Sequence, residues 1–169
     1  LRYLEHLIQD MLMFVKGETA GQESIPVSSL LAELQQVIEP QLAPNLKLIV
    51  SDRSDGATLL GSRKALAGAL LNLLENAMQA CHEGGTIRLT GSCVQQEIIL
   101  SVADDGVGIA PSVQERLFEP FFTTRGDGTG LGLAIVRGVT EAHGGKVELV
   151  STPGNGSEFL VHLPLGARS

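Results

Sequence analysis

LLNLLENAMQA, residues 70–80, forms the centre of a segment that is apolar on almost every side when it is drawn as a helix. We predict a helix that begins after Ser62, whose side chain can cap the first turn, and ends near Cys81. A helix with so little polar surface is expected to lie in the core. Polar side chains in a buried helix need hydrogen-bonding partners. In this helix they are Asn72, Glu75, Asn76 and Gln79.

The spacing of these four residues places them on one narrow face of the helix. One interpretation is a stripe that faces solvent and needs no ligand. The other is a stripe that faces a polar ligand, because an asparagine carbonyl oxygen suits a hard cation such as Mg²⁺ and its NH₂ group can donate to phosphate. The residues alone leave both interpretations open.

The chain around this helix alternates between helical and strand patterns, which predicts an α+β fold with a sheet covered by helices on one face. One segment, residues 103–129, has little regular pattern, and segments of this length are often lids or binding loops. The predicted helices cover residues 28–42, 62–81 and 131–143, and the predicted strands cover residues 46–50, 58–60, 86–90, 97–103, 146–151 and 157–163.

The sequence DDGVGI, residues 104–109, directly follows the strand predicted at 97–103. A carboxylate at a strand end, followed by two glycines, can accept a hydrogen bond from an amino group while the backbone lies against a flat ring. Adenine offers such a donor at its 6-amino group, whereas guanine presents an acceptor there. Asp-Gly turns are also common without any ligand, so this sequence is informative only together with others.

Glycines also gather in GDGTGLGL, residues 126–133, directly before the last predicted helix. Backbone N–H groups at a helix N-terminus form an anion site, and plain helix-entry glycines are the alternative. The spacing fits neither a Rossmann fingerprint nor a Walker loop. FEPFFTTR, residues 118–125, predicts either a hydrophobic anchor for a mobile loop or a phosphate contact through Arg125, Thr123 and Thr124.

Composition narrows the class of protein. Glycine supplies 20 of the 169 residues, which is above the usual share of about 7%. The hydrophobic fraction of 43% is sufficient for a core, and the net charge of −7 argues against nucleic acid as the main partner. Two cysteines suit a reducing compartment. The sequence contains no apolar run long enough to span a membrane, and we expect no signal peptide.

An appendage precedes the domain. Residues 1–16 carry an apolar stripe with helical spacing, which predicts a helix of a bundle or a dimer seam. Residues 17–27 predict a polar linker. Because the stripe is at full strength from Leu1, we expect the chain to be a fragment of something longer. The four histidines lack metal-ligand spacing, and His143, followed by two glycines, predicts a helix end.

Taken together, LLNLLENAMQA, DDGVGIA, FEPFFTTR, GTGLGLAIV, HGG and PGNGSEFLVHLP resemble the N, G1, F, G2 and last glycine boxes of sensor histidine kinases in order and spacing. The resemblance covers about residues 28–165. It implies the ATP-binding fold shared with gyrase, Hsp90 and MutL, a two-layer α/β sandwich with a mixed, mostly antiparallel sheet covered by helices on one face. In detail the boxes are most similar to those of nitrogen-regulation and flagellar sensor kinases.

The resemblance assigns roles to particular residues of this chain. Asn76, with Asn72, would hold Mg²⁺ and phosphate, and Gln79 occupies a stretch where many members carry a lysine. Asp104 would contact the adenine amino group, and Arg125 would lie near the γ-phosphate. The lid would run from about residue 111 to 128. The remaining implied contacts to ATP come from Gly106, Gly108, Ile109, Thr123, Thr124, Gly128, Thr129, Gly130, Leu131 and Gly132.

Position 72 separates two chemistries within the fold. The ATPase branches carry a glutamate there as general base, and asparagine cannot accept a proton in that way. The resemblance therefore implies a protein histidine kinase fragment that holds Mg-ATP and transfers the γ-phosphate, with Asn72, Asn76 and Arg125 as its catalytic residues. An ATPase or serine kinase of the same fold, or a non-catalytic nucleotide-binding module, are the alternatives.

The resemblance also implies partners. The phosphate acceptor would be a histidine on a dimerisation domain that this chain lacks, and residues 1–16 would be the end of that domain. A response regulator, of the σ54-activating type, would receive the phosphate. We expect a homodimeric parent with this domain in the cytoplasm, and we expect no nucleic acid or membrane contact by this fragment.

Overall fold

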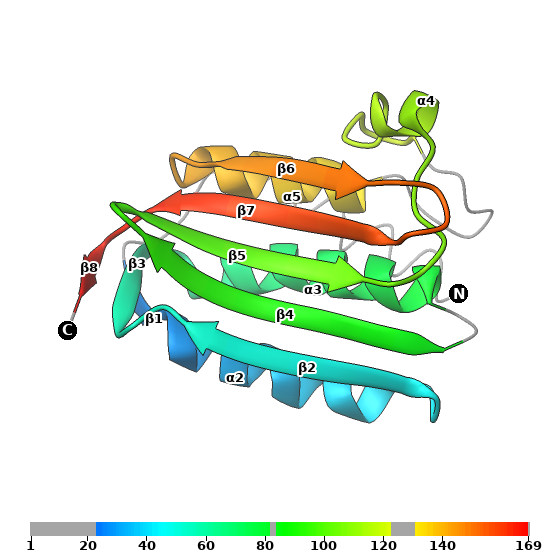
Figure 1. Cartoon of the computed structure of the whole chain (residues 1–169). Coiled ribbons are helices and arrows are strands. Elements are labelled where there is room, and N and C mark those ends of the chain that lie inside the picture. Colours follow the sequence, from blue (N-terminus) through cyan, green and yellow to red (C-terminus); the bar gives the residue numbers. More distant parts are fainter. Residues whose placement is uncertain (1–22, 82–83, 123–130, 169) are drawn as a thin grey trace, which may run out of the picture.

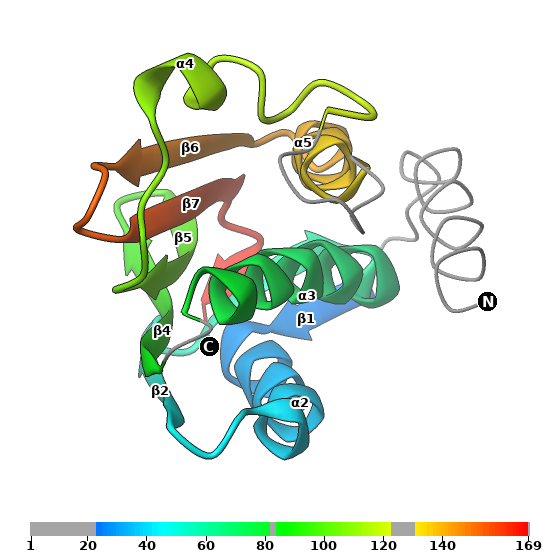
Figure 2. The same ribbon diagram turned by 90° about the vertical axis from the view of Figure 1, so that its right-hand side faces the viewer.

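A five-stranded sheet forms one layer of the computed structural model, which describes residues 23–81, 84–122 and 131–168 (Figure 1). Three helices cover one face of this sheet, as Figure 2 shows in the end-on view. The strand order is β2-β4-β5-β7-β6. The strands are β2 (Leu46–Arg53), β4 (Gly85–Val94), β5 (Glu97–Asp104), β6 (Lys146–Ser151) and β7 (Ser157–Pro164), and the helices are α2 (Val27–Ile38), α3 (Arg63–Ala80) and α5 (Gly132–Ala142).

The pairing of the sheet is mixed, as the predicted fold class requires. β2 and β4 are parallel, whereas β4–β5, β5–β7 and β6–β7 are antiparallel. Alternate residues of each strand point toward the helices, so the core contains, for example, Ile98, Leu100 and Val102 of β5, all at most 1% exposed. α3 contributes Leu66, Leu70, Leu73 and Leu74, which confirms that this helix is buried. A short 3₁₀ turn (Glu39–Gln41) follows α2, because Pro40 cannot continue the helix.

A second, three-stranded sheet lies at one end of the molecule, in the order β1-β3-β8. The linker predicted at residues 17–27 is wrong for its last part, since β1 (Glu23–Pro26) pairs with β3 (Ala57–Gly61) and Val27 begins α2. The cause is that Ile25 is the one buried residue among the four of β1, which is too few to give a periodic signal. β8 (Ala167–Arg168) was also not predicted. Residues 17–22 and the helix predicted at 1–16 lie outside the described residues.

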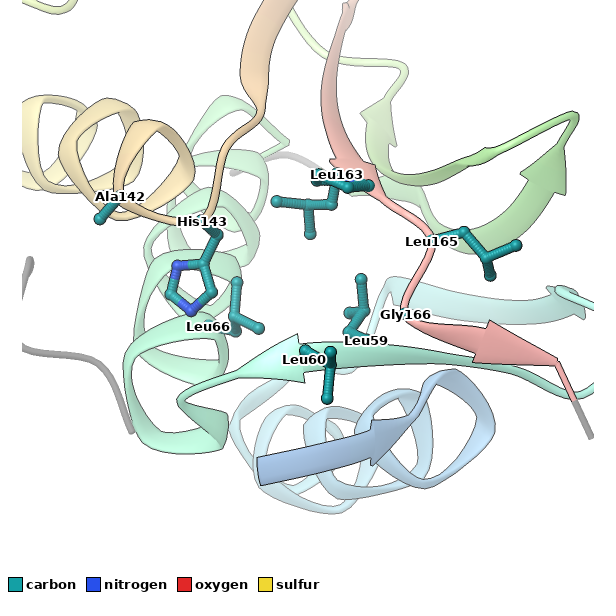
Figure 3. A pocket seen from close by; sticks show the side chains of 9 residues that line it. Leu59, Leu60, Leu66, Ala142, His143, Leu163, Leu165 and Gly166 are labelled. Atoms are coloured by element: carbon teal, nitrogen blue, oxygen red, sulfur yellow. The ribbon is translucent and has the colours of Figure 1, made fainter. Parts of the chain in front are cut away.

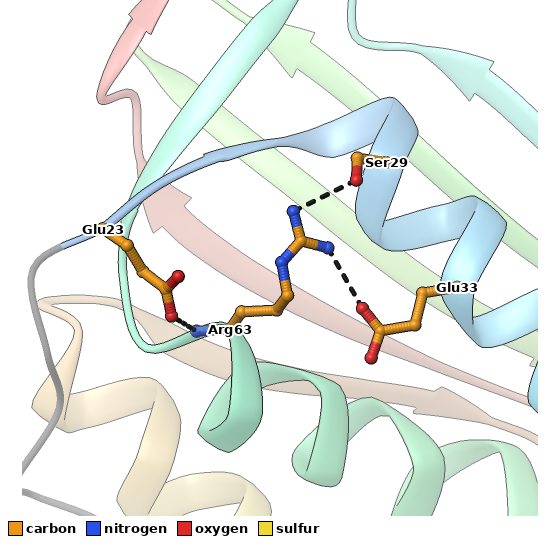
Figure 4. Close-up of polar contacts among 4 residues, drawn as sticks. All are labelled: Glu23, Ser29, Glu33 and Arg63. Carbon is orange, nitrogen blue, oxygen red and sulfur yellow. Dashed lines mark hydrogen bonds and ion pairs between the residues drawn. The ribbon is translucent and has the colours of Figure 1, made fainter.

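Side chains join β1, α2 and α3 at this end (Figure 4). The guanidinium of Arg63 donates to Glu33 Oε1 at 3.0 Å and to Ser29 Oγ at 3.1 Å, both on α2. The backbone N–H of Arg63 donates to Glu23 Oε1 of β1 at 2.9 Å. Arg63, the first residue of α3, therefore connects this helix to β1 and to the first turns of α2.

Ser62 and His143 connect the start of α3 to the end of α5. The Ser62 hydroxyl oxygen accepts from the Ala65 N–H at 3.1 Å, which confirms the predicted N-cap. His143 ends α5, as predicted; its Nε2 accepts from the Ser62 N–H at 3.1 Å, so Nδ1 carries the hydrogen and donates to the Val139 carbonyl at 2.7 Å. Beside this histidine lies a cavity of about 210 Å³ (Figure 3), lined by Leu59, Leu60, Leu66, Ala142, Leu163, Pro164, Leu165 and Gly166.

Candidate functional site

The candidate site lies at the C-terminal end of α3, opposite the end that Ser62 and His143 connect (Figure 1). The C-terminal half of α3, the end of β5 and the beginning of α5 all point to this end of the sheet. The segment after β5 rises from the same place and includes α4 (Pro111–Gln114), a single helical turn in the stretch predicted to have little regular structure.

One face of α3 forms the floor of the candidate site. Asn72, Asn76 and Ala80 are four residues apart and therefore lie on this face one turn after another. Gly132, the first residue of α5, lies so close that a Cβ on it would be 3.1 Å from Asn72 Oδ1. Gly106 lies so close to the Ala80 carbonyl that it has no room for a Cβ. Asn76 is thus flanked by the start of α5 on one side and by the turn after β5 on the other.

The polar stripe of α3 is not a simple solvent face. Asn72, Glu75 and Asn76 are half-buried, and Gln79 is exposed. The structure therefore places the two asparagines in a sheltered position where a ligand could be bound, whereas Gln79 lies at the rim. Their binding of Mg²⁺ and phosphate stays a prediction.

Asp104 closes the site at the end of β5. Its Oδ1 accepts from the Gly106 N–H at 2.9 Å, inside its own turn. Burial raises the pKa of this carboxyl above its ordinary value, and the negative charge of Asp105 adds to that effect. Hydrogen bonds from the backbones of Gly106 and Ser157 oppose it. A carboxylate kept partly out of water in this way is a stronger hydrogen-bond acceptor for a ligand than one in solvent.

The backbone after Asp104 is fixed by the turn between β6 and β7. Gly108 has φ +75°, and a Cβ there would overlap the Thr152 carbonyl, so this position requires glycine. The Ile109 N–H donates to Ser151 Oγ at 2.8 Å. Gln114 of α4 donates through Nε2 to the carbonyls of Ile109 at 2.7 Å and Ser151 at 3.2 Å. The structure thus brings Gly106, Gly108 and Ile109 together beside Asp104, and their contact with a base stays a prediction.

Sequence reasoning missed the two residues that hold this backbone, Ser151 and Gln114. Gln114 lies in the segment without regular pattern, and Ser151 is 37 residues further along the chain. A contact over such a distance in sequence leaves no local signal in a single sequence. A serine at the end of a strand predicted to enter a Pro-Gly turn was the available hint, and it is weak.

The phenylalanine-rich segment divides into anchored and exposed residues. The Phe118 ring packs edge-on against Phe159 of β7, with centroids 6.2 Å apart, so Phe118 anchors the segment as predicted. The Arg116 guanidinium lies 4.5 Å from the centroid of the Phe122 ring. Phe121, by contrast, is 64% exposed and has φ +69°. The predicted site residues Thr123, Thr124, Arg125, Gly128, Thr129 and Gly130 lie outside the described residues.

Histidines take no part in this site within the described ranges, whereas the Cys81 thiol donates to Asp105 beside it, at 3.6 Å. His162 lies on β7 between the carboxylates of Glu97, at 2.9 Å from Nδ1, and Glu148. No group of three or more His, Cys, Asp or Glu side chains suited to a metal ion is found in residues 23–81, 84–122 and 131–168. His6 and His82 are not among the described residues. A cation in the candidate site would therefore depend on amide oxygens and on its other ligands.

Comparison with known proteins decides the family. The sequence profile described as "Histidine kinase-, DNA gyrase B-, and HSP90-like ATPase" matches residues 61–167, more than half of the chain. The chain belongs to this family. Relatives identify the branch: the sensor histidine kinase ZraS of Escherichia coli K12 is 32% identical over 163 residues, and the sensor protein kinase FleS of Pseudomonas aeruginosa is 39% identical over 165 residues. These matches cover 96% and 98% of this chain.

Solved structures agree with the family. The full-length kinase ShkA, in a structure with AMPPNP, superposes with a TM-score of 0.86 at 32% identity, over 98% of this chain and 37% of that one. The histidine kinase ThkA, in complex with the response regulator TrrA, gives a TM-score of 0.78 at 26% identity, over 95% of this chain and 47% of that one. The chain is thus a histidine kinase catalytic ATP-binding domain.

The chain spans less than half the length of the relatives that it matches. It spans about a third of ZraS, at 35%, and 41% of FleS. Within the described ranges, none of the helices has the length and apolar character needed to cross a bilayer. The family indicated by the sequence motifs is confirmed, and the subgroup suggested by them agrees with the relatives FleS and ZraS.

Proposed function

We propose that this domain binds Mg-ATP at the C-terminal end of α3 and donates the γ-phosphate to a histidine of a separate dimerisation domain. The observation that carries the proposal is the position of Asn76 between the Asp104 turn and the start of α5. If adenine binds beside the Asp104 turn and the phosphates bind beside the start of α5, the phosphate-bound metal ion would lie next to Asn72 and Asn76. Family membership supports the same arrangement.

Asp104 is assigned to the adenine ring. Its carboxylate stands at the end of β5 and is partly buried, so a 6-amino group would find an acceptor with little competition from water. Gly106 and Gly108 leave the backbone beside it bare of side chains. A guanine would present its own acceptor to the same carboxylate and is therefore expected to bind weakly.

The residues of the α3 face fit a hard cation. Amide oxygens are among the ligands that Mg²⁺ accepts, usually together with phosphate oxygens and water. An Mg²⁺ ion held by Asn76 and Asn72 would neutralise part of the negative charge of the phosphates. Leu131, the residue before α5, carries no polar group that could cap the first N–H groups of that helix. Such N–H groups, with those of Gly128, Thr129, Gly130 and Gly132, are suited to the phosphates.

Arg125 completes the proposed phosphate site, with Thr123 and Thr124 beside it. A guanidinium binds two phosphate oxygens at once, which would orient the γ-phosphate toward an outside nucleophile. Gln79, at the exposed rim of the α3 stripe, would contact the nucleotide through its amide in place of a lysine. Phosphoryl transfer requires mainly positioning and charge neutralisation, and these residues supply both.

The chemistry at position 72 favours transfer over hydrolysis. Asn72 has no group that takes a proton from water, and Glu75 lies one position before Asn76 on the helix rather than at the place of the ATPase base. The domain alone is therefore expected to hold ATP and to release phosphate slowly. Fast hydrolysis that Glu75→Gln abolishes would indicate an ATPase instead.

The proposed partners follow from the proposed reaction. Residues 1–16 would be the end of the dimerisation domain of a homodimeric parent kinase, joined to the catalytic domain by residues 17–22. That parent would pass the phosphate to a response regulator, as the structure of ThkA with a response regulator suggests. The resemblance of the sequence motifs favours a regulator of the σ54-activating type and a cytoplasmic position for this domain.

Calorimetric titration of the chain with ATP, with and without Mg²⁺, tests the proposal. We expect Mg-dependent binding of ATP and little binding of GTP. Asp104→Asn keeps an acceptor but loses its charge, so ATP affinity should fall by about tenfold, the usual difference between charged and neutral hydrogen bonds. Glu33→Ala, on α2, removes the contact to Arg63 at the other end of α3; it is the control and should bind like wild type.

Two results would contradict the proposal. Absence of ATP binding by wild type would leave a module that binds only a partner protein. ATP binding without transfer of the γ-phosphate to the dimerisation domain of the parent kinase would leave a nucleotide sensor. The transfer is measured with radiolabelled ATP after the separate acceptor domain is added.

A further inference from the structure

The second aspartate of the turn, Asp105, reaches toward the start of β4 and the end of α3. Its Oδ1 accepts from the Thr86 N–H at the start of β4, at 3.0 Å. The same oxygen lies 3.6 Å from the Cys81 sulfur, which donates to it from the C-cap of α3. One carboxylate oxygen thus joins the exit of β5, the entry of β4 and the end of α3.

The Cys81 thiol is suited to remain a donor in this contact. Burial, the charge of Asp104 and the hydrogen bond to Asp105 together raise its pKa to about 11, so it keeps its proton at neutral pH. The side chain is only 2% exposed. Cys81 is therefore a buried, protonated hydrogen-bond donor with a structural role, and it is not a reactive thiolate.

These contacts tie the adenine side of the site to its metal side. Cys81 follows Asn76 by five residues, which is about 7.5 Å along a helix. Gly106, the neighbour of Asp105, packs against the carbonyl of Ala80 on the same last turn. The contact between Asp105 and Cys81 therefore also determines the distance between Asp104 and the two asparagines of α3.

We propose that Asp105 is a positioning residue that sets the distance between the adenine-recognising carboxylate of Asp104 and the metal-binding face of α3. This inference rests on the proposed function, since it assumes that ATP lies across both. Asp105 itself does not touch the nucleotide. It acts through Asp104, whose turn it holds against Cys81 and Thr86.

The test measures recognition of the 6-amino group and not binding alone. The dissociation constants of Mg-ATP and of purine riboside triphosphate, which lacks this amino group, give a ratio that reports the Asp104 contact. In wild type we expect a ratio of about 10 or more, typical of a hydrogen bond to a charged group. Asp105→Ala should lower the ratio at least about threefold, because Asp104 moves out of place. Asp105→Asn should preserve it, because its amide oxygen still accepts from Thr86.

Asp105→Asn also separates position from charge. The negative charge of Asp105 acts on Asp104, and both substitutions remove it. A ratio lowered equally by Asn and Ala would therefore assign the effect to charge and overturn the proposal. A general loss of stability would weaken both nucleotides equally and leave the ratio unchanged. Glu33→Ala, which removes a comparable contact at the other end of α3, is the matched control.

Cys81→Ala provides a second variant if Asp105→Ala fails to fold. It removes only the thiol donor, and the ratio should fall in the same direction by a smaller factor. An unchanged ratio in either alanine variant would overturn the proposal. A wild-type ratio near one, with ATP still bound, would instead show that Asp104 does not read the amino group, and both the adenine assignment and this inference would be abandoned.

Discussion

The two ends of α3 are built in different ways. At its start, side chains make the contacts: Arg63 pairs with Glu33, the Ser62 hydroxyl caps the helix, and the His143 ring accepts from the backbone N–H of Ser62. At its end, backbone lies against backbone at Gly106, and a partly buried carboxylate stands at Asp104.

The difference shows how stability and binding are divided along one helix. The contacts at the first end are complete within the chain, so they contribute to folding whether or not a ligand is present. The second end contains groups whose burial is unfavourable until something binds, which is typical of functional sites. We therefore expect substitutions at the start of α3 to change stability alone, and substitutions at its end to change binding.

Gly61→Ala is expected to give the largest effect on stability. A Cβ at this position would overlap the His143 ring, so the ring must move and lose its bond to the Ser62 N–H. Overpacking of this kind costs about 1–3 kcal/mol. Urea denaturation measures the change, and the ATP affinity of the folded variant should equal that of wild type.

Gly138→Ala is the control for this substitution. Gly138 lies in α5, and a Cβ there would meet nothing within 4 Å. Alanine is favoured over glycine in helices by up to about 1 kcal/mol, so this variant should be as stable as wild type or more stable. Equal destabilisation by both substitutions would contradict the role given to the His143 contact.

Ser62→Ala should produce an intermediate effect. It removes the oxygen that accepts from the Ala65 N–H, and loss of an N-cap costs about 1 kcal/mol. Thermal unfolding followed by circular dichroism measures the loss. Ser62→Asp restores an acceptor and should recover most of it. A fall in ATP affinity with Ser62→Ala would show that the two ends are coupled.

Asp104→Asn should have the smallest effect on stability. Unlike the substitutions at Gly61 and Ser62, it should not destabilise the protein. Burial raises the folded-state pKa of this carboxyl above its ordinary 3.8, so the folded chain holds the proton at a higher pH than the unfolded chain does. The contribution of Asp104 to stability therefore declines as the pH rises above 3.8 through the folded-state pKa. Asp104→Asn removes this decline. Its free energy of unfolding at pH 7 should equal or exceed that of wild type in urea titrations, and a clear loss would contradict the burial argument.

The sequence was sufficient for the parts of the fold that repeat a pattern. α3 begins and ends within one residue of its predicted limits, because a long apolar helix with a serine cap has several signals that agree. β1 escaped prediction because its burial depends on Ile25 alone, opposite Leu59 of β3. A four-residue strand has too few positions to establish a period.

The candidate site was predictable where it is local and not where it depends on distant contacts. Asp104, Gly106 and Gly108 form one short motif, and Asn72 and Asn76 form another. The structure places Asn72 against Gly132, as a shared site requires. Nothing in the sequence indicated that Asp105 reaches Cys81 and Thr86, since only the closed fold brings them together. The contributions of Arg125 and Thr129 stay predictions.

The parallel pairing of β2 with β4 has a consequence for the order of folding. β4 and β5 form a hairpin with a short turn and can pair while the rest of the chain is unfolded. β2 cannot join β4 until β3 and α3, which lie between them in sequence, have packed into place. We therefore expect the β2–β4 ladder to form late, since non-local pairings close slowly. The edge of the sheet farthest from α5 would be the last part to become protected from hydrogen exchange during refolding.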